Sequence, residues 1–183
     1  INRHAQHIYQ NRYNLACDYF NLGLLFTDKD DFATAKEFYG QSYSLFNNLK
    51  LKHELSDYYF NMGEIYSFQK EYHKAMDSYE KGLQIDVEQG NKPSLAADYN
   101  MVGELYVEMD QALQAEDYFN RAAGLAKEIK ARPELAAAYY NLGMLYKKAN
   151  KRSKAREYLR SAQEIYRLID TPEAERIRSE FSN

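Results

Sequence analysis

The octapeptide YYNLGMLY at residues 139–146 decides the fold of this chain, because three close relatives of it occur earlier in the sequence. They are YFNLGLLF at 19–26, YFNMGEIY at 59–66 and YNMVGELY at 99–106, the last with its asparagine moved by one place. Each has a glycine in fifth position, so the four glycines follow one another at intervals of 40 residues. A fixed period of roughly 20–50 residues marks a repeat array. We therefore expect four equivalent structural units.

A second series of residues runs in phase with the glycines. Twelve residues after each glycine stands an alanine, followed four residues later by a large apolar residue and three beyond that by a small one. The alanines are Ala35, Ala75, Ala115 and Ala155, the large residues Tyr39, Tyr79, Phe119 and Leu159, and the small ones Ser42, Gly82, Ala122 and Ala162. Spacings of 3, 4 and 7 place residues on one face of a helix. Each repeat thus predicts two helices, whose backbones approach closely at the glycine and the alanine.

These periodicities predict eight helices that alternate between a first and a second type. First helices are expected at 13–28, 53–68, 93–109 and 133–149, and second helices at 31–49, 71–89, 111–130 and 151–169. Asp30, Asp110 and Asn150 share a phase just before second helices and are predicted to be N-caps, because their side chains can accept from the first free amides. Residues 1–12 fit either the remnant of a preceding helix or an early start of the first one.

The repeat resembles the tetratricopeptide repeat, whose pattern of Trp or Tyr, Leu, Gly and Tyr, then Ala, Phe and Ala, recurs in all four copies over roughly residues 13–181. Ser42, Gly82 and Leu159 are mild departures. The usual repeat has roughly 34 residues, so the extra residues here predict longer helices. Such repeats are similar to those of Leu-Gly-Asn-type adaptors and of bacterial peptide-sensing regulators. The resemblance implies an all-α, right-handed superhelix (an α-solenoid) of four helix-turn-helix repeats plus a C-terminal capping helix.

We expect a single solenoid over residues 1–183, with repeats at about 13–50, 53–90, 93–130 and 133–170. The end of the chain supports a capping helix at 172–181. Thr171–Pro172–Glu173 is a typical helix start, and Ala174, Ile177 and Phe181 repeat the spacing of a first helix. Such a helix would cover the last repeat, as solenoids require. Because the sequence does not begin with methionine, we interpret it as part of a longer protein.

Composition narrows the possible functions of the chain. Its 183 residues carry a net charge of −3, which argues against non-specific binding of nucleic acid. No apolar run approaches the roughly 20 residues that span a bilayer, so no membrane contact is expected. The lone Cys17 excludes an internal disulfide framework and favours a reducing, cytoplasmic location. His4 and His7 lack further ligands for a metal. No catalytic or phosphate-binding motif occurs, so neither an enzyme nor a cofactor is expected.

The resemblance implies that the first helices line a concave groove that binds an extended peptide or a partner helix. The groove positions it implies lie three residues before and one after each glycine: Phe20, Leu24, Phe60, Glu64, Asn100, Glu104, Tyr140 and Met144. Two residues before the glycine stand Asn21, Asn61 and Asn141. In the family an asparagine there often holds a peptide backbone, because one amide can both donate and accept a hydrogen bond. The alternative is that these asparagines bridge neighbouring turns of their own protein.

Charge and aromatic residues refine this expectation. Acidic residues suggest an acidic middle of the groove and basic residues a basic end, although both sets would also suit a solvated surface. The acidic set is Asp57, Glu64, Glu104 and Glu108, and the basic set Lys147, Lys148, Lys151 and Arg152. Chaperone-binding arrays place Lys and Asn where Phe20 and Leu24 stand here, so acidic chaperone tails are not expected as ligands. The tyrosines that open the octapeptides, at 19, 59, 99 and 139, are expected in the core.

Three hypotheses about function remain open from the sequence. The first is a protein-interaction scaffold that holds a partner segment in the groove with aromatic anchors and asparagine clamps. The second is a sensory or regulatory array of a bacterial signalling protein that responds to a short peptide. The third is a structural module that self-assembles through its exposed repeat ends. The identity of the partner does not follow from the sequence.

Overall fold

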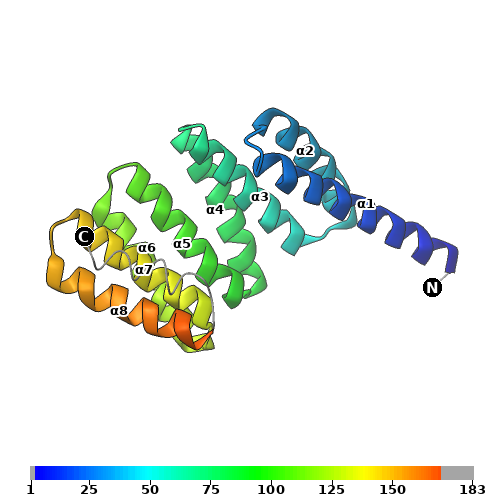
Figure 1. Cartoon of the computed structure of the whole chain (residues 1–183). Helices are drawn as coiled ribbons and strands as arrows, with labels where there is room; N and C mark the ends of the chain where they lie inside the picture. Colours follow the sequence, from blue (N-terminus) through cyan, green and yellow to red (C-terminus); the bar gives the residue numbers. More distant parts are fainter. Residues whose placement is uncertain (1–2, 170–183) are drawn as a thin grey trace. The chain divides into compact units, whose positions relative to one another are not determined.

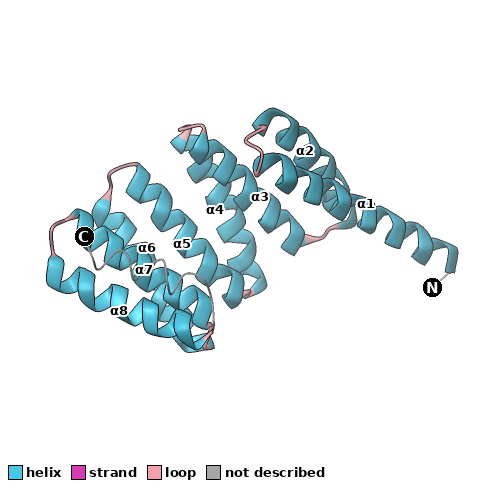
Figure 2. Ribbon diagram, in the orientation of Figure 1, coloured by secondary structure: helices cyan, strands magenta, loops and turns pink. Residues whose placement is uncertain are grey.

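The computed structural model describes residues 3–169, and all regular structure in that range is α-helical (Figure 2). Figure 1 shows the eight helices of this range, which are α1 Arg3–Thr27, α2 Phe32–Leu49, α3 Lys52–Phe68, α4 Tyr72–Gln89, α5 Lys92–Glu108, α6 Ala112–Ile129, α7 Arg132–Lys148 and α8 Arg152–Leu168. Consecutive helices pair as four hairpins. The predicted fold class, an all-α array of helix-turn-helix repeats of the α-solenoid kind, is confirmed. The predicted capping helix at 172–181 lies outside the described residues.

The hairpins form two compact units. The first unit contains α1 to α4, with α2 packed on α3, and the second contains α5 to α8, with α6 packed on α7. Helix ends agree with the predicted ones to within one residue, except at the start of α1. That helix begins at Arg3, so residues 3–12 are an early start of the first helix.

Each hairpin closes at its glycine, as predicted. A Cβ atom placed on Gly103 would lie 2.5 Å from Cε1 of Phe119, and one on Gly143 would lie 2.7 Å from Cγ of Leu159. Both large side chains are buried, so they fill the space that the glycine leaves. The same contact recurs in the first unit, in the pairs Gly23–Tyr39 and Gly63–Tyr79. Close backbone approach thus offsets the roughly 1 kcal/mol that a helical glycine costs relative to alanine.

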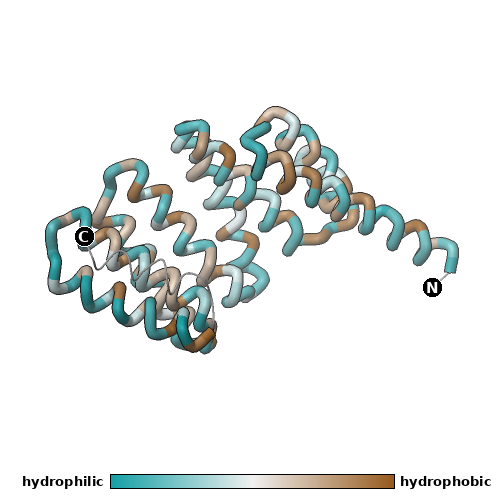
Figure 3. The backbone as a smooth tube through the Cα atoms, viewed as in Figure 1, coloured by the Kyte–Doolittle hydropathy of each residue, from teal (hydrophilic) through white to brown (hydrophobic). Residues whose placement is uncertain are grey.

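The core of each unit joins one hairpin to the next. Apolar and polar residues recur with helical spacing, so brown and teal segments follow one another along each helix in Figure 3. In both units, the alanine and the large residue of a second helix pack against two apolar residues of the following first helix. The sets are Ala35, Tyr39, Met62 and Ile65 in the first unit, and Ala115, Phe119, Leu142 and Leu145 in the second. These contacts explain the second series of the sequence pattern.

The tyrosines that open the octapeptides flank this core and are only half-buried. The ring of Tyr19 stacks on Phe38 with the centroids 6.2 Å apart, and that of Tyr139 meets Tyr158 at 5.6 Å. Tyr99 lies under the guanidinium of Arg121, 4.2 Å from its carbon. These rings therefore pack across the edge between the two helices of a hairpin.

Every turn between the described helices contains one residue with a left-handed backbone. Gly90 has a φ of 63°, and six non-glycine residues have φ between 57° and 60°: Asp30, Lys50, Lys70, Asp110, Lys130 and Asn150. The prediction that Asp30, Asp110 and Asn150 are N-caps is therefore wrong. The caps lie one residue later, where the side chain of Asp31 accepts from the backbone amide of Thr34. Asn and Asp adopt the left-handed region more readily than most residues, which explains their presence at this phase.

Candidate functional site

A hollow of about 400 Å³ lies between the two first helices of the second unit, α5 and α7. Its walls combine acidic, amide and apolar side chains, namely Glu104, Val107, Glu108, Phe119, Asn141, Met144, Leu145 and Lys148. Three of the groove residues expected from the sequence, Glu104, Asn141 and Met144, therefore meet at one place. An apolar floor with a few polar groups is the usual composition of a binding site.

Polar contacts fix three of these side chains. The amide nitrogen Nδ2 of Asn141 donates to Oε1 of Glu104 at 2.8 Å, and Nζ of Lys148 donates to Oδ1 of Asp110 at 2.6 Å. The first contact joins α7 to α5 across the hollow, and the second joins the end of α7 to the turn between α5 and α6. Lys148 therefore has a carboxylate partner already, whereas no basic side chain contacts Glu104 among the described residues.

The electrostatics of the hollow favour a cation. Partial burial raises the pKa of the Glu104 carboxyl, Glu108 raises it further, and the hydrogen bond from Asn141 opposes both effects. A carboxylate whose pKa is raised by burial and by a like charge is destabilised in its ionised form. A lysine or arginine entering the hollow would relieve this destabilisation.

A smaller hollow of about 160 Å³ lies between the first helices of the first unit, α1 and α3. It is lined by Cys17, Phe20, Asn21, Phe46, Glu54 and Asp57. Here too a carboxylate is partly withdrawn from water. Burial raises the pKa of Asp57, His53 lowers it, and Asp86 and Glu54 raise it. Each unit thus presents an acidic hollow between consecutive first helices.

Two expected groove residues are buried instead of exposed. Phe60 is 5% exposed and stacks on Tyr79 with ring centroids 5.3 Å apart, so it belongs to the core of the first unit. Asn100 is 6% exposed and donates from Nδ2 to the backbone carbonyl of Glu134 at 3.3 Å. The expectation that these side chains are exposed is therefore wrong.

The remaining expected residues lie at or near the surface. Leu24 and Asn21 are exposed, and Glu64 is half-buried. Tyr140 and Met144 are half-buried and pack against the cluster of Leu159 and Ala162. These residues could contact a ligand without exposing the core.

Asn61 already has partners within its own unit. Its Nδ2 donates to the backbone carbonyl of Asp57 at 2.8 Å, and its Oδ1 accepts from the hydroxyl of Tyr39 at 3.2 Å. This is the bridging role that the sequence left open as an alternative. Asn141 instead directs its amide into the hollow of the second unit, toward Glu104.

Among the lining residues, Cys17 and Val107 were not expected from the sequence, whereas Glu108 was expected in the acidic middle of the groove and Lys148 at its basic end. Both of the unexpected residues stand one helical turn from a predicted position: Cys17 four residues before Asn21, and Val107 three after Glu104. Extending each predicted position by three or four residues along the same helix face would have found them.

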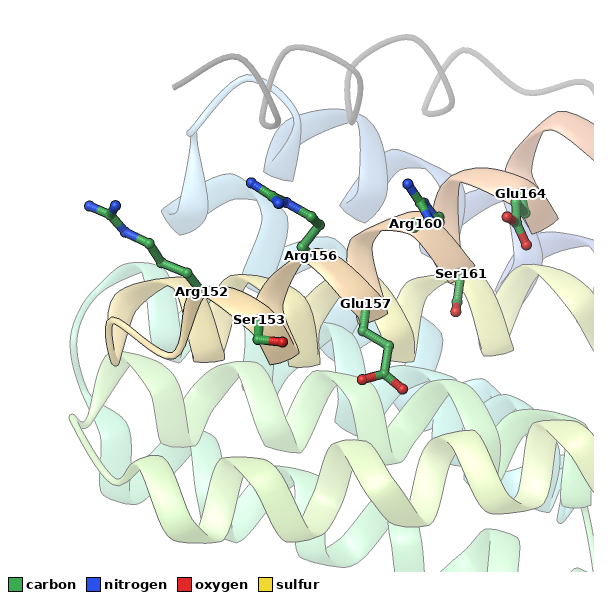
Figure 4. A pocket seen from close by; sticks show the side chains of 7 residues that line it. All are labelled: Arg152, Ser153, Arg156, Glu157, Arg160, Ser161 and Glu164. Atoms are coloured by element: carbon green, nitrogen blue, oxygen red, sulfur yellow. The ribbon is translucent and has the colours of Figure 1, made fainter.

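A third hollow runs along the outer side of α8 (Figure 4). Its lining is entirely polar and consists of Arg152, Ser153, Arg156, Glu157, Arg160, Ser161 and Glu164. The three arginines among them follow one another at four-residue spacing. The arginine side chains extend toward the same side of the helix in Figure 4. Among residues 3–169, no group of three or more His, Cys, Asp or Glu side chains is arranged to hold a metal ion.

Comparisons with known proteins agree with this architecture. A family model described as a tetratricopeptide repeat matches residues 14–86 and 93–167. Among solved structures, BtubC (BKLC) from P. vanneervenii has a TM-score of 0.74 at 20% identity, over 92% of this chain and 74% of that one. No curated protein sequence matches the chain. None of the helices in the described range is long and apolar enough to cross a membrane.

Two further solved structures are similar in fold. Aspartyl phosphate phosphatase F from Bacillus subtilis has a TM-score of 0.77 at 18% identity, over 91% of this chain and 44% of that one. A Rap protein complexed with Competence and Sporulation Factor has a TM-score of 0.75 at 18% identity, over 87% of this chain and 45% of that one. The chain therefore spans less than half the length of these two proteins.

Proposed function

Because this chain belongs to the tetratricopeptide repeat family, we propose that it binds an extended segment or a helix of a partner protein along its first helices. The family is generally non-enzymatic, and its repeat fold supports a protein-interaction scaffold. The surface that we propose for binding includes the acidic hollow between α1 and α3 and the one between α5 and α7.

The observation that carries the proposal is the composition of the hollow between α5 and α7. Its walls place the carboxylate of Glu104, whose pKa is raised by partial burial, beside Glu108, with Val107, Met144 and Leu145 as an apolar floor. Such a site suits a ligand that inserts an apolar side chain and carries a lysine or arginine next to it. The apolar contact would supply most of the binding free energy, and the charge pair would supply specificity.

The amide of Asn141 would contribute to recognition of the ligand backbone. It now donates to Glu104, and it is exposed enough to exchange that partner for a carbonyl group of the ligand. The released Glu104 would then pair with the cationic group of the ligand. Both exchanges replace one hydrogen bond by another, so they leave no polar group unpaired.

A second candidate function is a sensory array that changes conformation when it binds a signalling molecule. The observation in its favour is the likeness in fold to the Rap protein that is complexed with Competence and Sporulation Factor. In that case the ligand would bind the same surface, and the output would depend on parts of a longer protein.

The proposal is tested by selecting peptides from a random displayed library on the immobilised chain. We expect enrichment of lysine or arginine next to an aromatic or aliphatic residue, and binding that weakens as salt is added. The Glu104→Lys, Glu108→Lys double variant should lose these peptides. Asp117→Lys, on the exposed face of α6, is the matched control and should keep them.

Two outcomes would contradict the proposal. One is a selection that enriches acidic peptides, or that enriches no peptides at all. The other is equal binding by the double variant and the Asp117→Lys control, provided that all three proteins have the same helical circular dichroism. Either result would place the ligand surface away from the hollow between α5 and α7.

A further inference from the structure

Three tyrosines of the first unit meet where its first hairpin packs on its second. Tyr43 belongs to α2, and Tyr58 and Tyr59 belong to α3, the next helix along the chain (Figure 1). The centroid of the Tyr43 ring lies 4.7 Å from that of Tyr58 and 6.1 Å from that of Tyr59, and the rings of Tyr58 and Tyr59 are 5.2 Å apart. All three side chains are half-buried, so they form a tyrosine cluster that is packed but not sealed from solvent.

The repeat pattern accounts for only one member of this cluster. Tyr59 is one of the tyrosines that open the octapeptides, whereas Tyr43 and Tyr58 stand at positions where the other repeats have different residues. The equivalents of Tyr43 are Leu83, Ala123 and Gln163, and those of Tyr58 are Asp18, Asp98 and Ala138. The second unit forms the same junction, between α6 and α7, with alanine at both positions. The hairpins therefore pack without a phenol group at either position.

The hydroxyl groups of Tyr43 and Tyr59 meet at the centre of the cluster. Their oxygen atoms lie 3.5 Å apart, at the outer limit of a hydrogen bond in which either oxygen can donate. The ring planes cross at 69° with the centroids 6.1 Å apart, so the rings lie alongside each other at their hydroxyl ends and the carbon atoms next to each hydroxyl also come close. Burial and the neighbouring Tyr43 hydroxyl raise the pKa of Tyr59 to about 12, so Tyr59 faces Tyr43 as a neutral phenol.

We propose that Tyr43 and Tyr59 are a site of oxidative cross-linking, at which a one-electron oxidant such as a peroxidase acting with hydrogen peroxide joins the two rings as dityrosine. Each phenol gives one electron and one proton to the oxidant and becomes a phenoxyl radical, whose unpaired electron is shared by the oxygen and the ring carbons next to it. A bond forms between one Cε atom of each ring. Each of these carbons then loses its hydrogen to the oxygen of its own ring, which restores both phenols. The chain loses two hydrogen atoms in total, and one molecule of hydrogen peroxide becomes two of water.

Proximity selects this pair, because a phenoxyl radical is short-lived and must find a second radical. Two groups held in place by the fold react as if they were present at a very high concentration. The ring of Tyr58 also packs on Tyr43, tilted by 41°, but among residues 3–169 no hydrogen bond joins its hydroxyl group to either of the other two. Tyr58 is therefore expected to hold the rings in place and not to take part in the bond.

The cross-link would join two hairpins of the first unit. Tyr43 lies in the hairpin of α1 and α2, and Tyr59 in the hairpin of α3 and α4. A covalent bond between residues 16 apart in the sequence restricts the unfolded chain, so it favours the folded state. The inference concerns a covalent modification, and it does not depend on ligand binding in the hollows.

Treatment of the purified chain with a haem peroxidase and hydrogen peroxide tests the proposal. Trypsin cuts after Lys36, Lys50, Lys52 and Lys70, so the cross-link should join peptide 37–50 to peptide 53–70. Mass spectrometry should find this pair at the summed mass of the two peptides less two hydrogen atoms. The pair should be present in protein that runs as a monomer on a denaturing gel, together with dityrosine fluorescence. Absence of the linked peptides from the oxidised monomer would overturn the proposal.

Three conservative variants locate the bond, because the same peptides also contain Tyr39 and Tyr66. Phenylalanine keeps the packing of a ring and removes only its hydroxyl group. Tyr43→Phe and Tyr59→Phe should each abolish the linked peptides, whereas Tyr58→Phe, the matched control from the same cluster, should retain them. The assignment is wrong if the linked peptides persist in either of the first two variants or disappear in Tyr58→Phe, in proteins with equal helical circular dichroism.

Discussion

Replacing Gly103 by alanine should destabilise the chain, although the same change improves the intrinsic helix propensity. The gain in propensity is about 1 kcal/mol. Against it, the new Cβ would lie 2.5 Å from Cε1, 2.6 Å from Cδ1 and 3.1 Å from Cζ of Phe119. The Phe119 ring is buried and packs against α7, so it has little room to move away. Overpacking of this kind costs typically about 1–3 kcal/mol, so we expect a net loss of up to about 2 kcal/mol.

Gly124 provides the matched control, because it lies in the middle of α6 and a Cβ there would have no neighbour within 4 Å. Gly124→Ala should therefore gain the full propensity term of about 1 kcal/mol. Urea denaturation followed by far-ultraviolet circular dichroism measures both variants. The changes in the free energy of unfolding caused by the two substitutions should differ by about 1–3 kcal/mol. When the clash at Gly103 costs more than the gain in helix propensity, Gly103→Ala destabilises the chain while Gly124→Ala stabilises it. Equal effects would show that the contact between α5 and α6 is not as close as described, and would refute the role of the glycine.

Three further perturbations test other parts of the structure. Because burial raises the pKa of Asp57, its carboxyl binds a proton more readily in the folded state than in the unfolded state, and the folded state loses stability as the pH rises and this proton is released. Asp57→Asn should therefore be more stable than the parent at neutral pH and equally stable in acid, which urea denaturation at several pH values measures. Lys50, which follows the last residue of α2, has a φ of 58°, so Lys50→Gly should raise the free energy of unfolding by roughly 0.5–1 kcal/mol. Gln41→Gly in the interior of α2 should lower the free energy of unfolding by about 1 kcal/mol. The buried hydroxyl of Ser56 donates to the carboxylate of Asp86, so Ser56→Ala should lower the melting temperature through a loss of about 1–3 kcal/mol, and an unchanged melting temperature would argue against this buried bond.

The repeat pattern was sufficient to predict the helices, because helix pairing depends on residues that recur at fixed phase. Gly103 and Phe119 are opposite each other for the same reason as Gly143 and Leu159, and no residue outside the repeat is needed to explain either contact. The N-caps of the second helices were predicted one residue too early. Asp30 satisfies the composition of an N-cap, but a left-handed residue just before the cap has the same preference for short polar side chains.

The groove residues were harder to predict, because a rule based on distance from the glycine treats all repeats as identical. Phe60 departs from the rule because Gly82 stands opposite it: a Cβ on Gly82 would lie 2.5 Å from Cε2 of the ring. The Phe60 ring therefore fills the space above Gly82 and is buried. In the first repeat the equivalent small residue is Ser42, and Phe20 remains partly exposed. The identity of one residue on the partner helix thus decides whether an aromatic side chain is available to a ligand.

The left-handed residues that recur every twenty positions define how the chain can be cut and rejoined. Because each turn of the described range has the same backbone conformation at the same phase, a block that begins at one left-handed residue and ends two turns later carries a complete junction at both ends. Such a block is one repeat of 40 residues, and its duplication or loss creates no new type of turn. The turns, more than the helices, therefore set the unit in which this gene can lengthen or shorten while its protein still folds.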